Sequence, residues 1–469
     1  MVSVSGLLST GLLLSGRSVF QDIATPEQAS TDSNNIFRYL GGSAPYIQRQ
    51  GYGISTDIPE GCTLEQVQLY SRHVERFPTV NGGKVLELIY EKLQNYNQTF
   101  NGDLSFLNNG YTYFVEDSSY YALSTSPQNS KSTFAGTTNA LRHGATFRSR
   151  YGTLYDTNST LPVFSSNSAR VLETARYFAR GFLGDEFDES DEFDESNTVK
   201  FNVISEGKES GINTLTPRRG CPKYDDSVFE YISDRCNTSY LNGIAERLEK
   251  QNPGLNLTAS DAYSLFDWCA YEINVRGSSP FCNIFTNKEL LQFSYGDDLE
   301  KYYTDGPGNP QNKFVGGILV NASLELLKDN TNSNKIWLSF AHSADLAVYI
   351  AALGLFDINE DLPTDYIPFP NPYSHASIAP QGARIYTEKY QCNNESYVRY
   401  LVNDAVVPIS KCADGPGFSC KLDDFEDYVN DRIGGFNFTE VCGLNSSYPT
   451  EVSFYWDYKD VTYDAATKL

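Results

Sequence analysis

The chain has 469 residues, of which 36 are basic and 59 acidic, so its formal net charge is −23. Hydrophobic residues make up 40% and charged residues 20% of it, as in ordinary globular proteins, and the length predicts two or three domains or one large core with an insertion. The negative charge argues against broad binding to nucleic acid or anionic membranes, so a phosphate-bearing ligand would need a local group of arginines.

The N-terminal residues predict a secretory leader. Residues 1–15 carry no charged side chain and contain a short apolar run, about the size of a signal-peptide core. A basic start and a clear cleavage site are missing, but we predict a signal peptide over residues 1–20. No later run reaches the roughly 20 apolar residues that span a bilayer. We therefore expect a secreted, extracellular protein without membrane insertion, in the cell wall or periplasmic space.

Alternating strands and helices follow in the first half. Residues 63–70 alternate between apolar and polar and predict a strand, whereas 85–93 and 139–151 have helical spacing. A short apolar run at 161–164, a polar turn and an amphipathic stretch at 170–182 predict strand, turn and helix.

Residues 185–196 are a tandem repeat, DEFDES followed by DEFDES. We interpret it as a solvated surface loop, with a cation or partner site as the alternative. Helical patterns follow at 240–250 and 259–271.

The second half contains the most apolar strand pattern. Residues 335–340 form a near-continuous apolar run, which predicts a central strand buried on both faces. The run leads through His342 into a helical pattern at 344–356, and 383–390 and 396–402 predict late strands.

Two predicted strands end at a histidine, His73 and His342. Ligands of open α/β sheets bind at the carboxyl ends of strands, so these two residues are the first candidates for a shared site, with two structural histidines as the alternative. Arg72 and Arg76 flank His73. Guanidinium groups bind phosphate oxygens, and a neutral histidine between them suits covalent phosphoryl transfer.

Residues 71–79 resemble the Arg-His-Gly-x-Arg-x-Pro motif of the histidine acid phosphatases, especially the fungal secreted acid phosphatases and phytases. The resemblance covers roughly residues 38–460, with further matches in chain order at 41–46, 51–55, 106–108, 165–171, 338–342 and 416–442.

The resemblance implies a role for each matching residue. His73 would be the nucleophile that forms a phosphohistidine, Arg72, Arg76 and Arg170 would clamp the phosphoryl group, and His342 would add a donor. No cofactor or metal is implied.

The fold implied is α/β, with a mainly parallel sheet flanked by helices and an inserted, mostly helical domain. We expect the core to comprise residues 21–88, 160–182 and 314–469. The insertion would comprise 89–159 and 183–313.

Nine cysteines without a CxxC pair argue against a zinc ribbon and favour disulfides in an oxidising compartment. The resemblance implies a free Cys236 and four disulfides, namely Cys62–Cys392, Cys221–Cys442, Cys269–Cys282 and Cys412–Cys420. A glycoprotein is expected from eight Asn-x-Ser/Thr sequons, although chance gives nearly as many, at Asn97, Asn158, Asn237, Asn256, Asn321, Asn394, Asn437 and Asn445.

A second segment, Arg142-His143-Gly144, also matches the first three letters of the motif. Its next arginine is six residues after Arg142 instead of four, no proline follows, and it lies in a helical pattern. We therefore expect it to be structural.

Two departures from the family pattern fall on catalytic positions. Val74 stands where the family has glycine after the nucleophile, and Ser343 stands where it has the aspartate that protonates the leaving alcohol. Loss of a general acid typically costs roughly 10²–10⁴-fold in rate. Asp345 or Glu75 could substitute as the general acid. Alternatively, Asp345 could be a charge at a helix N-terminus, and Glu75 could be the partner of a nearby arginine.

These residues predict a secreted acid phosphatase or phytase-like phosphomonoesterase with reduced turnover and an acidic pH optimum. Its substrate would be phytate or a small organic phosphate. The alternatives are a pseudoenzyme that binds phosphate esters without hydrolysing them and an exported glycoprotein with a surface or storage role. The oligomeric state stays open.

Overall fold

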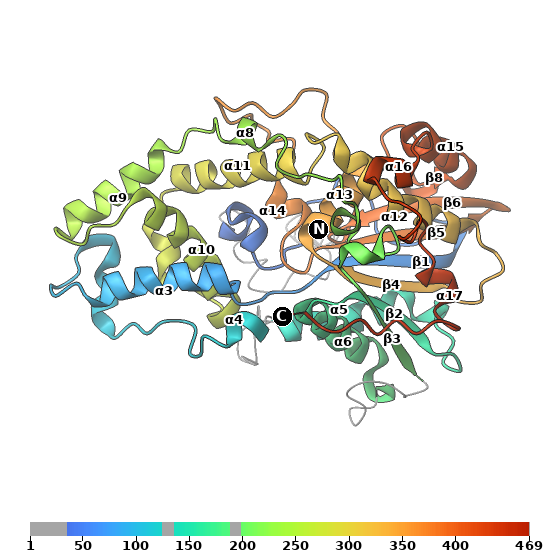
Figure 1. Cartoon of the computed structure of the whole chain (residues 1–469), viewed down its shortest axis with the longest axis horizontal. Helices are drawn as coiled ribbons and strands as arrows, with labels where there is room; N and C mark the ends of the chain where they lie inside the picture. Colours follow the sequence, from blue (N-terminus) through green and yellow to red (C-terminus); the bar gives the residue numbers. More distant parts are fainter. Residues whose placement is uncertain (1–34, 124–135, 188–197, 469) are drawn as a thin grey trace, which may run out of the picture.

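A computed structural model describes residues 35–123, 136–187 and 198–468. The predicted signal peptide and most of the DEFDES repeat lie outside these residues. Figure 1 shows the sheet on one side of the molecule and a group of helices on the other.

An eight-stranded sheet forms the core, in the order β3-β2-β4-β1-β5-β6-β7, with β8 beside β6. Its first four strands, β3 (Val199–Ile204), β2 (Leu161–Ser166), β4 (Ile336–Ala341) and β1 (Cys62–Arg72), run parallel. Every residue of β4 is buried, as its apolar run predicts. The carboxyl ends of four neighbouring strands therefore share one edge.

The remaining strands are antiparallel, so the sheet is mixed and not mainly parallel. They are β5 (Arg384–Cys392), β6 (Glu395–Val402), β7 (Ala405–Val406) and β8 (Cys420–Lys421). Asn393 and Asn394, both with positive φ, make the two-residue turn between β5 and β6. Such a turn requires a hairpin, which makes its strands antiparallel.

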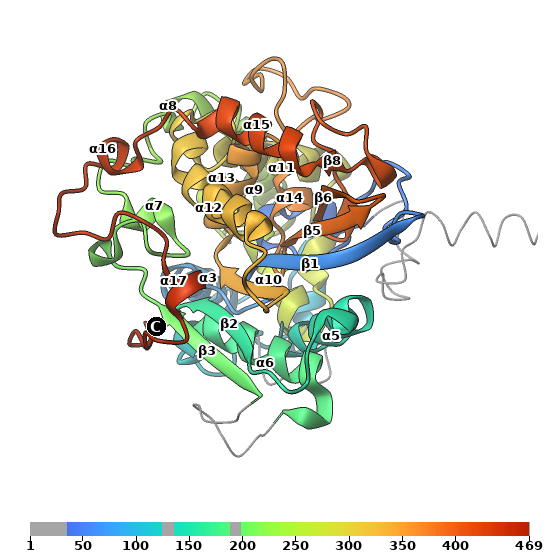
Figure 2. The same ribbon diagram turned by 90° about the vertical axis from the view of Figure 1, so that its right-hand side faces the viewer.

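Helices cover both faces of the sheet (Figure 2). On one face α5 (Gly136–Tyr151) and α6 (Ala169–Leu183) pack on Leu338 and Phe340 of β4. On the other face α12 (Gln311–Lys328), α13 (Ser343–Leu353) and α15 (Leu422–Ile433) share a core with Trp337. The mixed α/β fold class is confirmed. The structure places α5 and β3, which we expected in the insertion, against or within the sheet.

A second hydrophobic core joins the helices on the left of Figure 1. It contains residues of α3 (Val80–Gln94), α9 (Ser239–Gln251), α10 (Ala259–Arg276) and α11 (Asn287–Thr304). Capping boxes start α10 at Thr258 and α11 at Thr286, which stabilises both helix N-termini. The short helices are α4 (Tyr120–Leu123), α7 (Pro217–Gly220), α8 (Glu230–Ser233), α14 (His375–Ile378), α16 (Phe438–Cys442) and α17 (Phe454–Asp457).

The four expected disulfides are confirmed, and Cys236 is a free thiol. Cys62–Cys392 joins β1 to β5 at directly paired positions, and Cys269–Cys282 ties α10 to the turn that follows it. The bonds therefore reinforce the sheet and the helical part separately.

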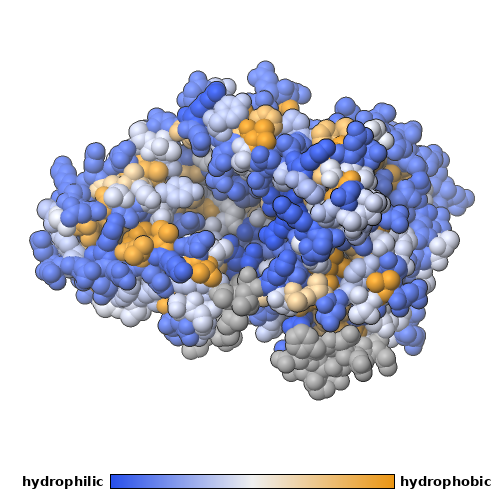
Figure 3. All heavy atoms as spheres, in the orientation of Figure 1, coloured by the Kyte–Doolittle hydropathy of each residue, from blue (hydrophilic) through white to orange (hydrophobic). Residues whose placement is uncertain are grey.

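The visible surface is mostly hydrophilic, with apolar patches over the helical part (Figure 3). All eight sequon asparagines are exposed, whereas eight other asparagines are buried, so glycan attachment is sterically open at every predicted site. No helix of the described residues is long and apolar enough to cross a membrane.

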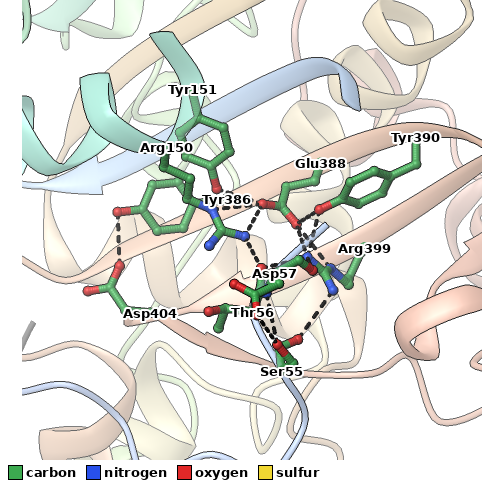
Figure 4. Close-up of polar contacts among 10 residues, drawn as sticks. All are labelled: Ser55, Thr56, Asp57, Arg150, Tyr151, Tyr386, Glu388, Tyr390, Arg399 and Asp404. Carbon is green, nitrogen blue, oxygen red and sulfur yellow. Dashed lines mark hydrogen bonds and ion pairs between the residues drawn. The ribbon is translucent and has the colours of Figure 1, made fainter. Parts of the chain in front are cut away.

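A buried charge network braces the antiparallel half of the sheet (Figure 4). Glu388 of β5 is fully buried and pairs with Arg150 of α5 at 2.6 Å and with Arg399 of β6 at 2.9 Å. Arg399 also donates to the backbone oxygens of Thr56 and Asp57. Burial opposes the charge, but the two arginines lower the pKa of Glu388 to about 2.

We expect Glu388→Gln to lower the free energy of unfolding by about 3–5 kcal/mol at pH 6, because the buried Arg399 and the partly buried Arg150 would both lose their counter-charge. The lowered pKa stabilises the fold above the unfolded value of about 4.3, and this contribution is lost as pH falls towards 2. The urea unfolding curves of the wild type and of Glu388→Gln should therefore converge at low pH. The surface control Glu395→Gln, which removes an exposed pair with Lys421, should cost below about 1 kcal/mol.

Candidate active site

The two candidate histidines lie side by side at the shared edge of the parallel strands. His73 follows β1 and His342 follows β4, and the His73 amide donates to the carbonyl of Ala341 at 3.1 Å. Their ring centroids are 5.9 Å apart. The parallel pairing of β1 with β4 thus brings together residues far apart in sequence.

The surroundings of His73 define its tautomer. Its Nδ1 lies 2.9 Å from the carbonyl oxygen of Val74, which can only accept, so Nδ1 carries the hydrogen and Nε2 keeps its lone pair. Burial, followed by the charges of Arg72, Arg170 and Arg76, holds the pKa of His73 well below its ordinary value of 6.5. A neutral, nucleophilic imidazole results.

Three guanidinium groups gather around His73. Arg72 donates to the carbonyls of Gly42 and Ala379, Arg76 donates to that of Phe77, and Arg170 lies in the first turn of α6. Burial and the charge of Arg76 lower the pKa of Arg72 to about 9 and that of Arg170 to about 10.

No carboxylate of the described residues forms a salt bridge with these three arginines. Their Nε atoms are buried and lack a hydrogen-bond partner among the same residues. Positively charged N–H donors that lack a partner are suited to bind the oxygens of a phosphoryl group.

His342 connects this cluster to a carboxylate. Its Nε2 lies 2.6 Å from Oε1 of Glu206, and its Nδ1 lies 3.4 Å from Nη2 of Arg170. Arg219 also pairs with Glu206. Burial opposes the charge, but the hydrogen bond from His342 and nearby charges lower the pKa of Glu206 to about 2.

The sequence analysis missed Glu206, which lies two residues after β3. A sequence pattern could have indicated it, since residues 199–204 are a short, mostly apolar run, typical of a strand, that ends near an acidic residue. The same rule that selected His73 and His342, a polar residue after a strand, applies to it.

Ser343 and Asp345 begin α13, and only the former is partly open to solvent. The Asp345 side chain is fully buried and forms an ion pair at 3.5 Å with Arg218 of α7. Burial raises the pKa of Asp345 to about 6. This carboxyl therefore lies within ion-pair distance of Arg218, and neither of its oxygens has a hydrogen-bond partner among the described residues.

Val74 and Glu75 also point away from the arginines. A Cβ added to Gly136 would lie only 3.1 Å from a Val74 methyl, so this glycine makes room for the side chain, and Gly382 also adjoins it. Val74 is not among the residues with positive φ and is accommodated without backbone strain. The Glu75 carboxylate accepts the amide of Tyr46 at 2.7 Å.

His143 of the second motif-like segment lies inside α5, as expected. It is buried, its Nε2 is 2.9 Å from the Tyr386 hydroxyl, and its ring contacts Phe178. The structure therefore gives it a packing role far from a strand end.

The helical part contributes residues that the sequence analysis did not find. The guanidinium of Arg76 lies 5.5 Å above the ring of Tyr271 of α10, whose hydroxyl is 3.4 Å from that of Ser43. Ser43 also donates to Asp267, whose burial raises its pKa to about 6. These contacts form the wall opposite the sheet, and no local sequence pattern marks them.

Residues 63–403 match the histidine phosphatase superfamily (branch 2). A phytase of Candida albicans is 64% identical over 100% of both chains, and an acid phosphatase of Saccharomyces cerevisiae is 44% identical over 98% of each. The crystal structure of a phytase from D. castellii matches with a TM-score of 0.89 and 54% identity, covering 96% of each chain.

Proposed function

The chain belongs to branch 2 of the histidine phosphatase superfamily, and from this membership we propose that it is a phosphoric monoester hydrolase that works through a phosphohistidine on His73. One observation carries the proposal. A neutral His73, with Nε2 free, lies among three arginines that form no salt bridge with a carboxylate of the described chain.

The reaction follows from this geometry. Nε2 of His73 attacks phosphorus, the bond from phosphorus to the ester oxygen breaks, and the leaving alcohol takes a proton. Arg72, Arg76 and Arg170 stabilise the charge on the equatorial oxygens. Water then attacks the phosphohistidine, releases inorganic phosphate and restores His73.

Two observations favour phytate or another organic phosphate as substrate, at acidic pH, and the four disulfides favour an oxidising compartment outside the cell. Relatives at 64% and 54% identity are named phytases. A net charge of −23 repels a polyanion near neutral pH, and protonation of carboxylates weakens this repulsion in acid. The lowered pKa keeps His73 neutral there.

Ser343 favours a second candidate, a pseudoenzyme that binds phosphate esters without hydrolysing them, because serine is too weak an acid to protonate an alkoxide. We propose instead an enzyme with reduced turnover on poor leaving groups. Val74 contributes less to this reduction, since it packs against two glycines.

Phosphate release from 4-nitrophenyl phosphate and from phytate at pH 4–5 tests the function, together with acid quenching to trap an acid-labile, base-stable phosphohistidine. Release from the aryl ester and a phosphohistidine on His73 are expected. Phosphate binding without release from either substrate would favour the pseudoenzyme.

Ser343→Asp should raise kcat on phytate by about 10–10²-fold, because it places a carboxylic acid at the start of α13 beside His342. The aryl ester, which needs little protonation, should change less than about threefold. Ser260→Asp, in the exposed first turn of α10, introduces the same charge elsewhere and should change neither rate. An equal gain on both esters would contradict a missing proton donor.

A further inference from the structure

Five carboxyl groups are candidates around the arginine cluster, and four of them contact other groups. Asp297, which acts on the charge of Arg72, pairs with His375 at 2.7 Å. Glu75 accepts a backbone amide, Asp345 faces Arg218, and Asp267 accepts from Ser43 on the opposite wall. Glu206 is the carboxylate that contacts His342, at 2.6 Å.

Glu206 determines which nitrogen of His342 faces the reaction. An ionised carboxylate can only accept, so the hydrogen on Nε2 belongs to the bond with Glu206. Nδ1 is left on the side of Arg170, 3.4 Å from its Nη2 and within the cluster that surrounds His73.

The ends of three neighbouring parallel strands hold this arrangement. His342 follows β4, Glu206 follows β3, and Asn167, directly after β2, accepts the backbone amide of Glu206 at 3.0 Å. Arg219 of α7 binds the other carboxylate oxygen. Glu206 is therefore rigidly placed and almost fully buried.

We propose that His342 and Glu206 act as a pair that supplies the proton to the leaving oxygen, in place of an acid at position 343. His342 is the catalytic residue and Glu206 is the positioning residue that orients and charges it. This inference rests on the proposed phosphomonoesterase function and deepens it.

In this scheme His342 gives up one proton in the first half-reaction and regains one in the second. While His73 attacks phosphorus, the N–H bond at Nδ1 of protonated His342 breaks and an O–H bond forms on the leaving alcohol. The neutral His342 that results keeps the hydrogen on Nε2, which still donates to the Glu206 carboxylate. In the second half-reaction Nδ1 takes a proton from the attacking water, which regenerates the imidazolium.

Because of the charges around His342, its pKa depends on whether a phosphate ester is bound. Arg170 of α6, Arg219 of α7 and the cluster at the end of β1 oppose a positive ring, whereas Glu206 favours it. Burial, with these arginines, lowers the pKa of His342 to about 4. A bound phosphate dianion offsets the arginine charges, so the pKa of His342 rises towards the acidic working range when substrate is bound.

Glu206→Gln tests the pair, because it keeps the shape and removes the charge. With an alkyl substrate, glycerol 2-phosphate, kcat should fall about 10–10²-fold, and the basic limb of its pH profile should shift to lower pH. With 4-nitrophenyl phosphate kcat should change less than about threefold. Glu209→Gln, the same substitution at an exposed position of the same loop, should leave both rates unchanged.

The double variant Glu206→Gln/Ser343→Asp should recover the alkyl rate, since the new acid replaces the pair. Equal losses on both esters, without recovery, would reduce Glu206 to a structural role and overturn the inference. A selective loss in Asp345→Asn, with none in Glu206→Gln, would assign the proton to Asp345 and also overturn it.

The wild-type enzyme gives a check that needs no variant. Its kcat for glycerol 2-phosphate should fall above a single pKa that lies higher than the value of about 4 for His342 without substrate, while kcat for the aryl ester stays flat there. If the pH profiles of kcat for the two esters were parallel, they would contradict proton donation by the His342–Glu206 pair but not the proposed function. Absence of release from both esters would refute the proposed function itself and this inference with it.

Discussion

His73→Ala is expected to lower kcat on 4-nitrophenyl phosphate by at least about 10⁴-fold, because in our proposal it removes the atom that bonds to phosphorus. The acid-labile phosphoenzyme should disappear with it. Initial rates and acid-quench trapping, both at pH 4–5, measure the two effects.

The control is His143→Gln, which keeps a hydrogen-bonding group for Tyr386 at the other motif-like segment. It should retain wild-type kcat once its folded fraction is verified by circular dichroism. Loss of the phosphoenzyme in this variant, and its survival in His73→Ala, would reverse the assignment of the nucleophile.

Arg170→Gln is expected to lower kcat/KM by about 10²–10³-fold on both aryl and alkyl esters. Its guanidinium lies in the first turn of α6 beside His342, where, in our proposal, it stabilises charge on the transferred group irrespective of the alcohol. Inorganic phosphate should also inhibit the variant more weakly, which initial rates at increasing phosphate concentrations measure.

Arg180→Gln changes an exposed arginine in the last turn of the same helix and provides the matched control. It should leave kcat/KM and phosphate inhibition unchanged. A loss in Arg170→Gln confined to poor leaving groups would instead make Arg170 part of the proton transfer and argue against its place in the phosphate clamp.

These two predictions and the Glu206 test separate three tasks at one sheet edge. In our proposal His73, directly after β1, provides the nucleophile, and Arg72, Arg76 and Arg170 bind the phosphoryl group. His342 and Glu206, at the ends of β4 and β3, provide the proton in our proposal. The parallel half of the sheet places each group from a different strand or its following helix.

Local patterns were sufficient to predict most elements near the site. The apolar run at 335–340 predicts β4 because its side chains pack alternately into two different cores. The run at 161–164, followed by an amphipathic stretch, likewise predicts β2 and α6. The helices at 287–304 and 311–328 were not predicted, because polar and apolar residues are mixed around their circumference and leave no clear amphipathic face.

The sequence by itself determined the residue types of the chemistry, namely the histidine between two arginines, the second histidine after a strand and the serine in place of an acid. The pattern around His73 is local, so spacing along the chain suffices to recognise it. The disulfide pairs followed from the resemblance.

Only the tertiary structure decided which carboxylate serves His342. From sequence only Asp345 and Glu75 were considered, and Glu206, which also lies near a strand end, was missed. Strand pairing and burial distinguish them, directing Asp345 to Arg218, Glu75 to Tyr46 and Glu206 to His342. These contacts join residues up to 136 positions apart, and no local pattern encodes such a distance.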